Sequence, residues 1–333
     1  MSAVPRFVSI ASAWFRIRVG TGSPGDSGGC SLLLIERLFP TLSSPPRLTI
    51  PSHHIVIPTP SSSPHPHPPK AGTPSVDITD FHPRLFSLDG RNAIVTGGNT
   101  GLGQAFSLAL AKAGANVFVA SALADDGTTR ALVEATGRRM EFLKADLTEP
   151  GVPRQVVRGC VEAFGSVDIL VNSAGIATLA TVEEFGRAEW DPMVAINLTA
   201  AFELSHEATS FMIPQRSGKI INIASVFSVL GGRWSPAYAA TKHGIAGFTK
   251  AYCDELAQYN IQVNALAPGY FATRITEATR TDPESNQRVL DHIPAARWGE
   301  AADLMGAVVF LASRASDYIN GVVLPVDGGY LVR

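Results

Sequence analysis

From Arg91 to the C-terminus, short apolar runs rich in β-branched residues alternate with longer segments that repeat apolar residues at helical spacing. Apolar strands that alternate with helices indicate a parallel sheet with helices on both faces. The pattern therefore predicts one doubly wound α/β domain with about seven parallel strands. We expect strands at NAIVTGG, NVFVA, EFLKADL, DILVNSAG, KIINIAS, IQVNALAP and VVLPVDGG, and helices that include residues 103–112, 128–136 and 239–258.

The first 76 residues lack this alternation and hold 13 of the 23 prolines. Proline fixes φ and has no backbone donor, so the stretch Ser61 to Pro69 (SSSPHPHPP) predicts an extended tether. This part is basic, with six Lys or Arg and two acidic residues, whereas the remainder has 21 basic and 27 acidic residues. We expect a disordered Pro/Ser-rich extension over residues 1–76 and one folded domain over residues 77–333.

Composition narrows the functional class. The chain of 333 residues is 45% hydrophobic and 17% charged, with a formal net charge of −2. It lacks a strongly basic tract of the kind that binds nucleic acid or an anionic membrane, and it lacks an apolar run of about 18 residues that would cross a bilayer. We therefore expect a small-molecule substrate, with no nucleic-acid and no membrane partner.

The three cysteines, Cys30, Cys160 and Cys253, are widely spaced and form no CxxC motif. This pattern fits neither a disulfide framework nor a structural zinc site, so we expect free thiols in a reducing compartment, a cytoplasmic protein and no metal. The acidic-poor start MSAVPRFVSIASAWFRIR shares weak features with organelle transit peptides. Organelle import through residues 1–76 and a mis-started segment therefore both stay open.

The first expected strand ends in TGGNTGLG, from Thr96 to Gly103, and leads into a helix. Glycine lets the backbone turn tightly and approach a diphosphate, whose charge the free N–H groups at the helix start can meet. The spacing Gly-x-x-x-Gly-x-Gly differs from the commoner GxGxxG, and a plain turn also uses glycine. Its place in a βαβ unit favours dinucleotide binding.

Tyr238 and Lys242 stand four residues apart in YAATK, so on a helix their side chains share one face. A phenol is a poor base at neutral pH, but an adjacent ammonium favours the phenolate and lowers the phenol pKa. Tyr238 is then a candidate to exchange a proton with an alcohol or a carbonyl. Such pairs are also common on solvated helices, so the spacing alone does not settle the role.

Three further polar residues lie close to predicted strand ends or inside a helix. Ser225 ends KIINIAS, at the edge of the sheet where ligands bind in open α/β proteins, and its hydroxyl is a candidate to hold a substrate oxygen. Asn172 in NSAG and Asn197 in INLTAAF are polar within apolar surroundings. Either asparagine alternatively caps or bridges the backbone.

In order and approximate spacing, these motifs and the later Pro268-Gly269 resemble those of the classical short-chain dehydrogenases/reductases, from about Phe86 to Arg333. The resemblance implies a Rossmann-like single domain, an NAD(P)-dependent oxidoreductase that acts on CH–OH groups, and a homotetramer. It implies that Tyr238 is the catalytic acid/base and that Lys242 binds the nicotinamide ribose and tunes Tyr238. It also implies that Ser225 positions the reacting oxygen and that Asn197 supports a water-linked proton relay.

The same resemblance implies the remaining cofactor contacts. The diphosphate would lie against Gly97, Gly101, Leu102 and Gly103. Asp146 would face the adenine, Asn172 the adjacent ribose and Thr273 the carboxamide.

The choice between NAD and NADP rests on the residues after the second expected strand. Ser121 stands where NAD-preferring members often have an acid that binds the adenine ribose hydroxyls, and Asp125 and Asp126 come later. No Lys or Arg directly follows this strand or lies among Gly98, Asn99 and Thr100 to pair with a 2′-phosphate. We therefore favour NAD over NADP.

Within the family, FSLDGRNAIVTGGNTGLGQ and the C-terminal segment from IPAARWG to VDGGYLVR resemble the 2-dehydro-3-deoxy-D-gluconate 5-dehydrogenase subfamily, which implies a keto sugar acid as substrate. A sugar acid needs a cationic cradle, and Arg233 and Arg274 are candidates, although either is alternatively a surface ion-pair partner. The subfamily usually has Arg at the place of Trp234. The stretch from Tyr270 to Ile293 resembles the mobile substrate flap of the family.

Other functions stay open at this point. A gluconate 5-dehydrogenase and a 3-oxoacyl thioester reductase are alternatives within the enzyme class, although a basic docking patch for a carrier protein is not evident in the sequence. A non-catalytic nucleotide-binding scaffold is the alternative of a different class.

Overall fold

The computed structural model describes residues 7–10, 13–19, 33–37 and 81–333, and the chain divides into two compact units, Met1–Val76 and Asp77–Arg333. In the first unit, β1 (Phe7–Ile10), β2 (Ala13–Val19) and β3 (Leu33–Arg37) form an antiparallel sheet in the order β1-β2-β3.

These three strands lie within residues 1–76. Their sequences FVSI, AWFRIRV and LLIER are rich in β-branched and aromatic residues, which favour strands. The expected disorder of this stretch as a whole stays a prediction. The predicted tether from Ser61 to Pro69 lies outside the described residues.

The second unit contains the predicted parallel sheet of seven strands, in the order β10-β9-β8-β7-β4-β5-β6. All six strand pairs are parallel. The strands are β4 (Asn92–Thr96), β5 (Asn116–Ser121), β6 (Met140–Lys144), β7 (Ile169–Asn172), β8 (Gly218–Ile223), β9 (Ile261–Pro268) and β10 (Val323–Val326). The doubly wound α/β fold predicted from the apolar runs is therefore confirmed.

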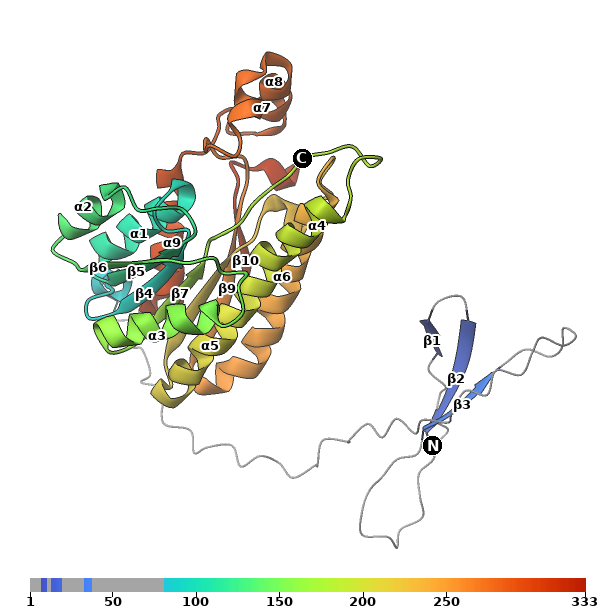
Figure 1. The fold of residues 1–333 in the computed structure, drawn as a ribbon, viewed down its shortest axis with the longest axis horizontal. Coiled ribbons are helices and arrows are strands. Elements are labelled where there is room, and N and C mark those ends of the chain that lie inside the picture. Colours follow the sequence, from blue (N-terminus) through green and yellow to red (C-terminus); the bar gives the residue numbers. More distant parts are fainter. Residues whose placement is uncertain (1–6, 11–12, 20–32, 38–80) are drawn as a thin grey trace, which may run out of the picture. The chain divides into compact units, whose positions relative to one another are not determined.

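Helices cover both faces of this sheet, as Figure 1 shows. On one face, α1 (Gly101–Ala113), α2 (Thr128–Glu134) and α9 (Met305–Ala312) bury residues such as Phe106 and Leu311 against the strands. On the other face, α3 (Val152–Phe164), α5 (Ala200–Gln215) and α6 (Pro236–Leu256) bury residues such as Val157 and Leu204. Because both faces are covered, strands such as β4, β8 and β9 are buried along their whole length, which explains their continuous apolar runs.

The remaining helices lie along the edge where the strands end. Helix α4 (Arg187–Val194) leads through a π-helical turn, Ala195–Thr199, into α5. Helices α7 (Glu277–Thr281) and α8 (Pro283–His292) follow β9 and stand out from the body of the domain (Figure 1).

Five of the six predicted helix boundaries differ from the observed ones by one to three residues, and only the start of α2 coincides. Helix α2 ends at Glu134, two residues before the predicted end, and α6 begins at Pro236, three residues before the predicted start. Proline is favoured in the first turn because its missing N–H would be unpaired there in any case. The prediction for α6 relied on the apolar period alone and overlooked this signal.

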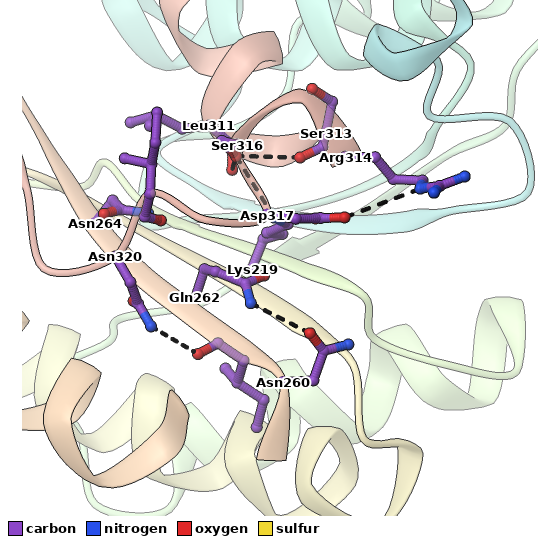
Figure 2. A network of polar contacts seen from close by, with 12 residues as sticks. Lys219, Asn260, Gln262, Asn264, Leu311, Ser313, Arg314, Ser316, Asp317 and Asn320 are labelled. Carbon is purple, nitrogen blue, oxygen red and sulfur yellow. Dashed lines mark hydrogen bonds and ion pairs between the residues drawn. The ribbon is translucent and has the colours of Figure 1, made fainter. Parts of the chain in front are cut away.

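A polar network joins residues of β8 and β9 to the segment that leads into β10 (Figure 2). The Lys219 Nζ atom, at the start of β8, lies 2.8 Å from Asp317 Oδ1. Burial lowers the pKa of Lys219, and the nearby Asp317 carboxylate opposes this shift. Asn264 on β9 donates to the Ile319 carbonyl and accepts from the Val322 N–H. These bonds tie β8 and β9 to the segment that leads into β10.

Candidate active site

The carboxyl ends of the parallel strands meet at one edge of the sheet, and most of the predicted site residues lie there. In the strand order, β4 has β7 on one side and β5 on the other, so the chain connections run in opposite directions from β4. Such a switch point opens a crevice outside the strand ends, which is the usual ligand site of open α/β sheets.

The glycine turn after β4 has a backbone that requires glycine. Gly97 and Gly101 have φ values of +62° and +54°, and a Cβ atom on Gly103 would collide with the Gly97 carbonyl. Apart from its chain neighbours and the backbone of its own helix, no atom of the described residues lies within 4 Å of the position that a Cβ on Gly101 would take, so the turn has open space there. The N-cap residue of α1, Thr100, makes no side-chain capping hydrogen bond, which leaves the first amides of α1 available. The turn therefore fits a diphosphate group, with Leu102 in the first turn of the helix.

The loop after β5 is held against the glycine turn. Asn99 is 5% exposed and donates from Nδ2 to the carbonyls of Leu123 and Ala124, whereas its Oδ1 atom is buried without a partner. Ser121 ends β5 and accepts a hydrogen bond from the Leu123 N–H. The loop thus offers serine and backbone groups, and neither Lys nor Arg occurs between Ser121 and Thr129.

Asp146 lies in an exposed turn after β6. Its carboxylate accepts hydrogen bonds from the N–H (3.0 Å) and the hydroxyl (2.7 Å) of Thr148. These two bonds hold the pKa of Asp146 below its ordinary value, and the bond from the Thr148 hydroxyl has the larger effect. Asp146 is therefore anionic at neutral pH and stands at the same edge of the sheet as the glycine turn.

Ser225, Tyr238 and Lys242 come together at the end of β8. Ser225 follows the strand and its Oγ accepts from the Phe227 N–H (3.2 Å) as the cap of a short 3₁₀ turn. Tyr238 and Lys242 face it from the first two turns of α6, and the Lys242 Nζ atom lies 5.4 Å from the centre of the Tyr238 ring. Lys242 Nζ also donates to the Ile223 carbonyl (2.7 Å), which fixes it at the strand end.

Burial dominates the electrostatics of this cluster. It raises the pKa of Tyr238, and a side-chain hydrogen bond with Ser225 opposes the shift only in part. Burial also lowers the pKa of Lys242 to about 8. We expected Lys242 to lower the pKa of Tyr238; instead, the pKa of Tyr238 in this structure lies above its ordinary value, because desolvation of the phenolate is the larger effect.

Asn197 holds the loop after β7. The Ile176 N–H donates to its Oδ1 (2.8 Å), and its Nδ2 donates to the Ile176 carbonyl (2.9 Å) and to Thr241 Oγ1 (3.4 Å). The residue sits in the π-helical turn before α5 and is 3% exposed. Single π-helical turns inside helices are frequent at functional sites. The side chain thus links this loop to α6, one residue from Lys242.

The Asn172 side chain points into the core. Its Nδ2 donates to Ser205 Oγ (3.0 Å) and to Asn222 Oδ1 (2.8 Å), and its Oδ1 is buried without a partner. The structure therefore brings Asn172 into a buried amide network between β7, β8 and α5. A longer bond from Nδ2 to the Ala201 carbonyl (3.4 Å) is the contact that corresponds to the backbone bridge left open by the sequence.

The other predicted residues lie on loops near the cluster. Thr273 is partly buried beyond the end of β9, and its N–H donates to Thr276 Oγ1. Arg274 is exposed, and Arg233 is exposed with its guanidinium 4.4 Å from the centre of the Trp234 ring. Neither arginine is brought close to Tyr238 by a contact that the structure describes.

Two residues that the sequence analysis did not single out stand beside the site. Tyr270 packs edge-on against Phe227, which packs edge-on against Tyr238, with ring centres 6.4 Å and 6.0 Å apart. Burial, followed by the neighbouring phenols of Tyr330 and Tyr238, raises the pKa of Tyr270 well above its ordinary value, so it stays protonated. Because Tyr270 directly follows the Pro268-Gly269 motif, the sequence could have indicated its place beside the site. The second residue, Arg280, had no local signal.

Within the described residues, no group of three or more His, Cys, Asp or Glu side chains is placed to hold a metal ion. In the same part of the chain, no helix has the length and apolar character needed to span a membrane.

Known proteins resemble this chain over the folded domain. Residues 91–284 match the family model described as short chain dehydrogenase. The chain is 65% identical over 256 residues to "Uncharacterized oxidoreductase YgcW" of Escherichia coli (strain K12), an alignment that covers 77% of this chain and 98% of that protein. It is 46% identical over 250 residues to the 2-dehydro-3-deoxy-D-gluconate 5-dehydrogenase of the same strain, over 74% of this chain and 98% of that protein.

A solved structure is similar over the same region. A crystal structure from Agrobacterium tumefaciens, provisionally named a 2-deoxy-d-gluconate 3-dehydrogenase and containing NADP, matches with a TM-score of 0.71 at 44% identity. The match covers 75% of this chain and 99% of that one.

Proposed function

Because the chain belongs to the short-chain dehydrogenase family and is an NAD(P)-dependent oxidoreductase that acts on CH–OH groups, we propose that it interconverts a secondary alcohol and a ketone on a keto sugar acid. The substrate we favour is that of a 2-dehydro-3-deoxy-D-gluconate 5-dehydrogenase. The observation that carries the chemistry is the cluster of Ser225, Tyr238 and Lys242 at the end of β8. The choice of sugar acid rests on the relatives that bear such names.

The residues of the cluster have separate tasks in this proposal. Bound NAD(P) would supply or accept the hydride. Tyr238 gives its proton to the carbonyl oxygen in reduction and takes it back in oxidation, and the Ser225 hydroxyl holds the same oxygen. Lys242, fixed by the Ile223 carbonyl, places a positive charge beside the phenol while that proton moves.

We propose that Asn197 supports the proton relay by holding neighbouring segments in place. Its Oδ1 accepts from the Ile176 N–H, and its Nδ2 donates to the Ile176 carbonyl and to Thr241 Oγ1. The side chain therefore holds the loop after β7 against α6. The cofactor would lie along the strand ends, with its diphosphate at Gly97, Gly101, Leu102 and Gly103 and its adenine near Asp146. The ribose would lie above the end of β7 at Asn172, whose side chain itself points into the core, and the carboxamide near Thr273. The Arg233 and Arg274 side chains are proposed contacts for the substrate carboxylate.

We propose NAD as the preferred dinucleotide. The loop from Ser121 to Thr129 carries Asp125 and Asp126 and neither Lys nor Arg, so it repels a 2′-phosphate rather than pairing with it. The related Agrobacterium structure contains NADP, which makes the direct comparison of NADH and NADPH necessary.

The first experiment measures consumption of NADH and of NADPH by the full chain with 2,5-dioxo-3-deoxygluconate, 5-ketogluconate and an acetoacetyl thioester. We expect the highest kcat/KM for NADH with 2,5-dioxo-3-deoxygluconate. Preferential turnover of 5-ketogluconate would instead identify a gluconate 5-dehydrogenase. Turnover of the thioester alone would exclude sugar acids and leave the oxidoreductase assignment intact.

The catalytic assignment has its own test in Tyr238→Phe. This substitution removes only the hydroxyl, so we expect turnover to fall by about 1,000-fold, the middle of the range for one acid–base group, while NADH binding measured by fluorescence stays within a few-fold. A non-catalytic scaffold would keep its biological role after the same substitution.

We also propose a cytoplasmic homotetramer. Cys160 and Cys253 are free, and burial raises the pKa of Cys160 to about 12, as expected for unreactive thiols in a reducing compartment. Cys30 lies outside the described residues.

A further inference from the structure

The start of the flap folds back on itself around Thr276. The Thr276 hydroxyl lies 2.6 Å from the Phe271 carbonyl and 3.1 Å from the Thr273 carbonyl, and it accepts from the Thr273 N–H. One turn later, the Arg280 N–H donates to the Thr276 carbonyl, and Arg280 Nη2 donates to the Thr273 carbonyl (3.1 Å). These bonds fix the Arg280 guanidinium beside Thr273, just beyond the end of β9.

Arg280 differs from the other cations of the flap in its burial and its partners. Its side chain is partly buried, its Nε atom is buried without a hydrogen-bond partner, and no carboxylate of the described residues lies within ion-pair distance. By contrast, Arg288 on α8 is paired with Glu284 (2.8 Å), and Asp282 accepts from the Ser285 N–H.

A partly desolvated cation without an anion is unfavourable. Burial of a charge costs free energy unless an opposite charge and hydrogen bonds replace the lost water. A bound anion would supply both, and a guanidinium with free N–H groups can take a carboxylate in a bidentate arrangement.

We propose that Arg280 binds the carboxylate of the substrate and so makes the flap selective for sugar acids over neutral polyols, an inference that rests on the proposed function. The dinucleotide diphosphate is the other anion of this site. Its amide donors lie in the glycine turn after β4, and three strand spacings, about 14 Å, separate β4 from β9 in the sheet. The position of Arg280 beyond β9 therefore favours the substrate carboxylate.

The experiment compares Arg280→Gln with the matched control Arg288→Gln in the full chain, with Arg280→Lys as a conservative variant. KM and kcat are measured with NADH for 2,5-dioxo-3-deoxygluconate and for its neutral amide, and NADH affinity is measured by fluorescence. We expect Arg280→Gln to raise KM for the acid roughly 10- to 100-fold, the range for loss of a charged hydrogen bond, and to change KM for the amide less than threefold. The KM of Arg280→Lys for the acid should lie between those of the wild type and Arg280→Gln. The KM of Arg288→Gln should match that of the wild type.

A second readout is independent of turnover. With NADH present, D-gluconate should protect the wild type against thermal unfolding more than D-glucitol does, and Arg280→Gln should lose this difference. If the wild type turns over no sugar acid, the proposed function fails, and the protection assay alone decides the role of Arg280. Equal losses for acid and amide, or a weakened NADH affinity with an unchanged acid-to-amide ratio, would overturn the proposal.

Discussion

At the scale of single residues, burial sets the protonation states of Tyr238 and Lys242. Both side chains lie at the sheet edge, and burial disfavours the charged form of each, so the pKa of the phenol rises and the pKa of the amine falls to about 8. At neutral pH, Tyr238 therefore holds its proton, ready to donate it to a carbonyl, and most Lys242 side chains carry their charge. The two states coexist only below the pKa of Lys242.

This pair predicts how carbonyl reduction depends on pH. The pKa of Lys242 is lowered, so the ammonium form is present below about pH 8 and is lost as the pH rises through that value. We expect kcat/KM for NADH, which reports groups of the free enzyme, to be constant from pH 6.5 to about 7.5 and then to fall about tenfold per pH unit above pH 8. Initial rates across pH 6 to 10 measure this.

A control separates Lys242 from other titrating groups. Lys242→Met should lower the rate strongly and remove the fall near pH 8, since the titrating group is gone. A wild-type profile that is level up to pH 10 would show that the charge on Lys242 does not assist the reaction.

At the scale of elements, the turn from β4 into α1 is where backbone conformation and binding meet. Gly101 has a positive φ and open space where a Cβ would lie, and it is the first residue of α1. If that space receives the diphosphate, a methyl group there should obstruct the ligand without disturbing the packing of the protein.

Gly101→Ala and Gly137→Ala form a matched pair. Gly137, after α2, also has a positive φ (+79°) and no neighbour within 4 Å of its Cβ position. We therefore expect both variants to lose a similar stability, about 1 kcal/mol, from the strained backbone. Only Gly101→Ala should weaken NADH binding, by at least about tenfold, which is 1.4 kcal/mol.

Urea unfolding and NADH fluorescence titration measure the two quantities on the same samples. If both variants bind NADH as the wild type does, the open space at Gly101 is not the diphosphate site. If Gly101→Ala alone unfolds at much lower urea, Gly101 is required for the fold of the turn itself.

The sequence predicted those elements whose signals are local. The buried strands β8 and β9 follow from uninterrupted apolar runs, and Ser225, Tyr238 and Lys242 follow from motif order. The direction of the Asn172 side chain could not be predicted, because its partners Ser205 and Asn222 come from α5 and β8. Likewise, Arg280 approaches Thr273 only through the turn around Thr276, so nothing in its immediate sequence distinguishes it from the exposed Arg274.

At the scale of the whole molecule, the described domain leaves an aromatic surface on α5 and α6. Phe202 is 46% exposed and packs against Phe248 and Tyr252, with ring centres 6.1 Å and 6.3 Å away. The edge strand β10 is also partly exposed, but Pro325 within it has no N–H with which to extend the sheet into a second copy. The aromatic surface is therefore the better candidate for contact between copies.

We expect the full chain to be a homotetramer, and Phe202→Glu to dissociate it. The substitution places a charge at the centre of an apolar contact, where it would be buried without a partner on assembly. Size-exclusion chromatography with light scattering measures the mass, and far-UV circular dichroism checks that the fold is kept. Tyr318→Glu is the control, because Tyr318 is fully exposed and lies outside the aromatic cluster. If Phe202→Glu stays tetrameric while Tyr318→Glu dissociates, the copies meet through the surface around Tyr318 and the aromatic face of α5 and α6 has another role.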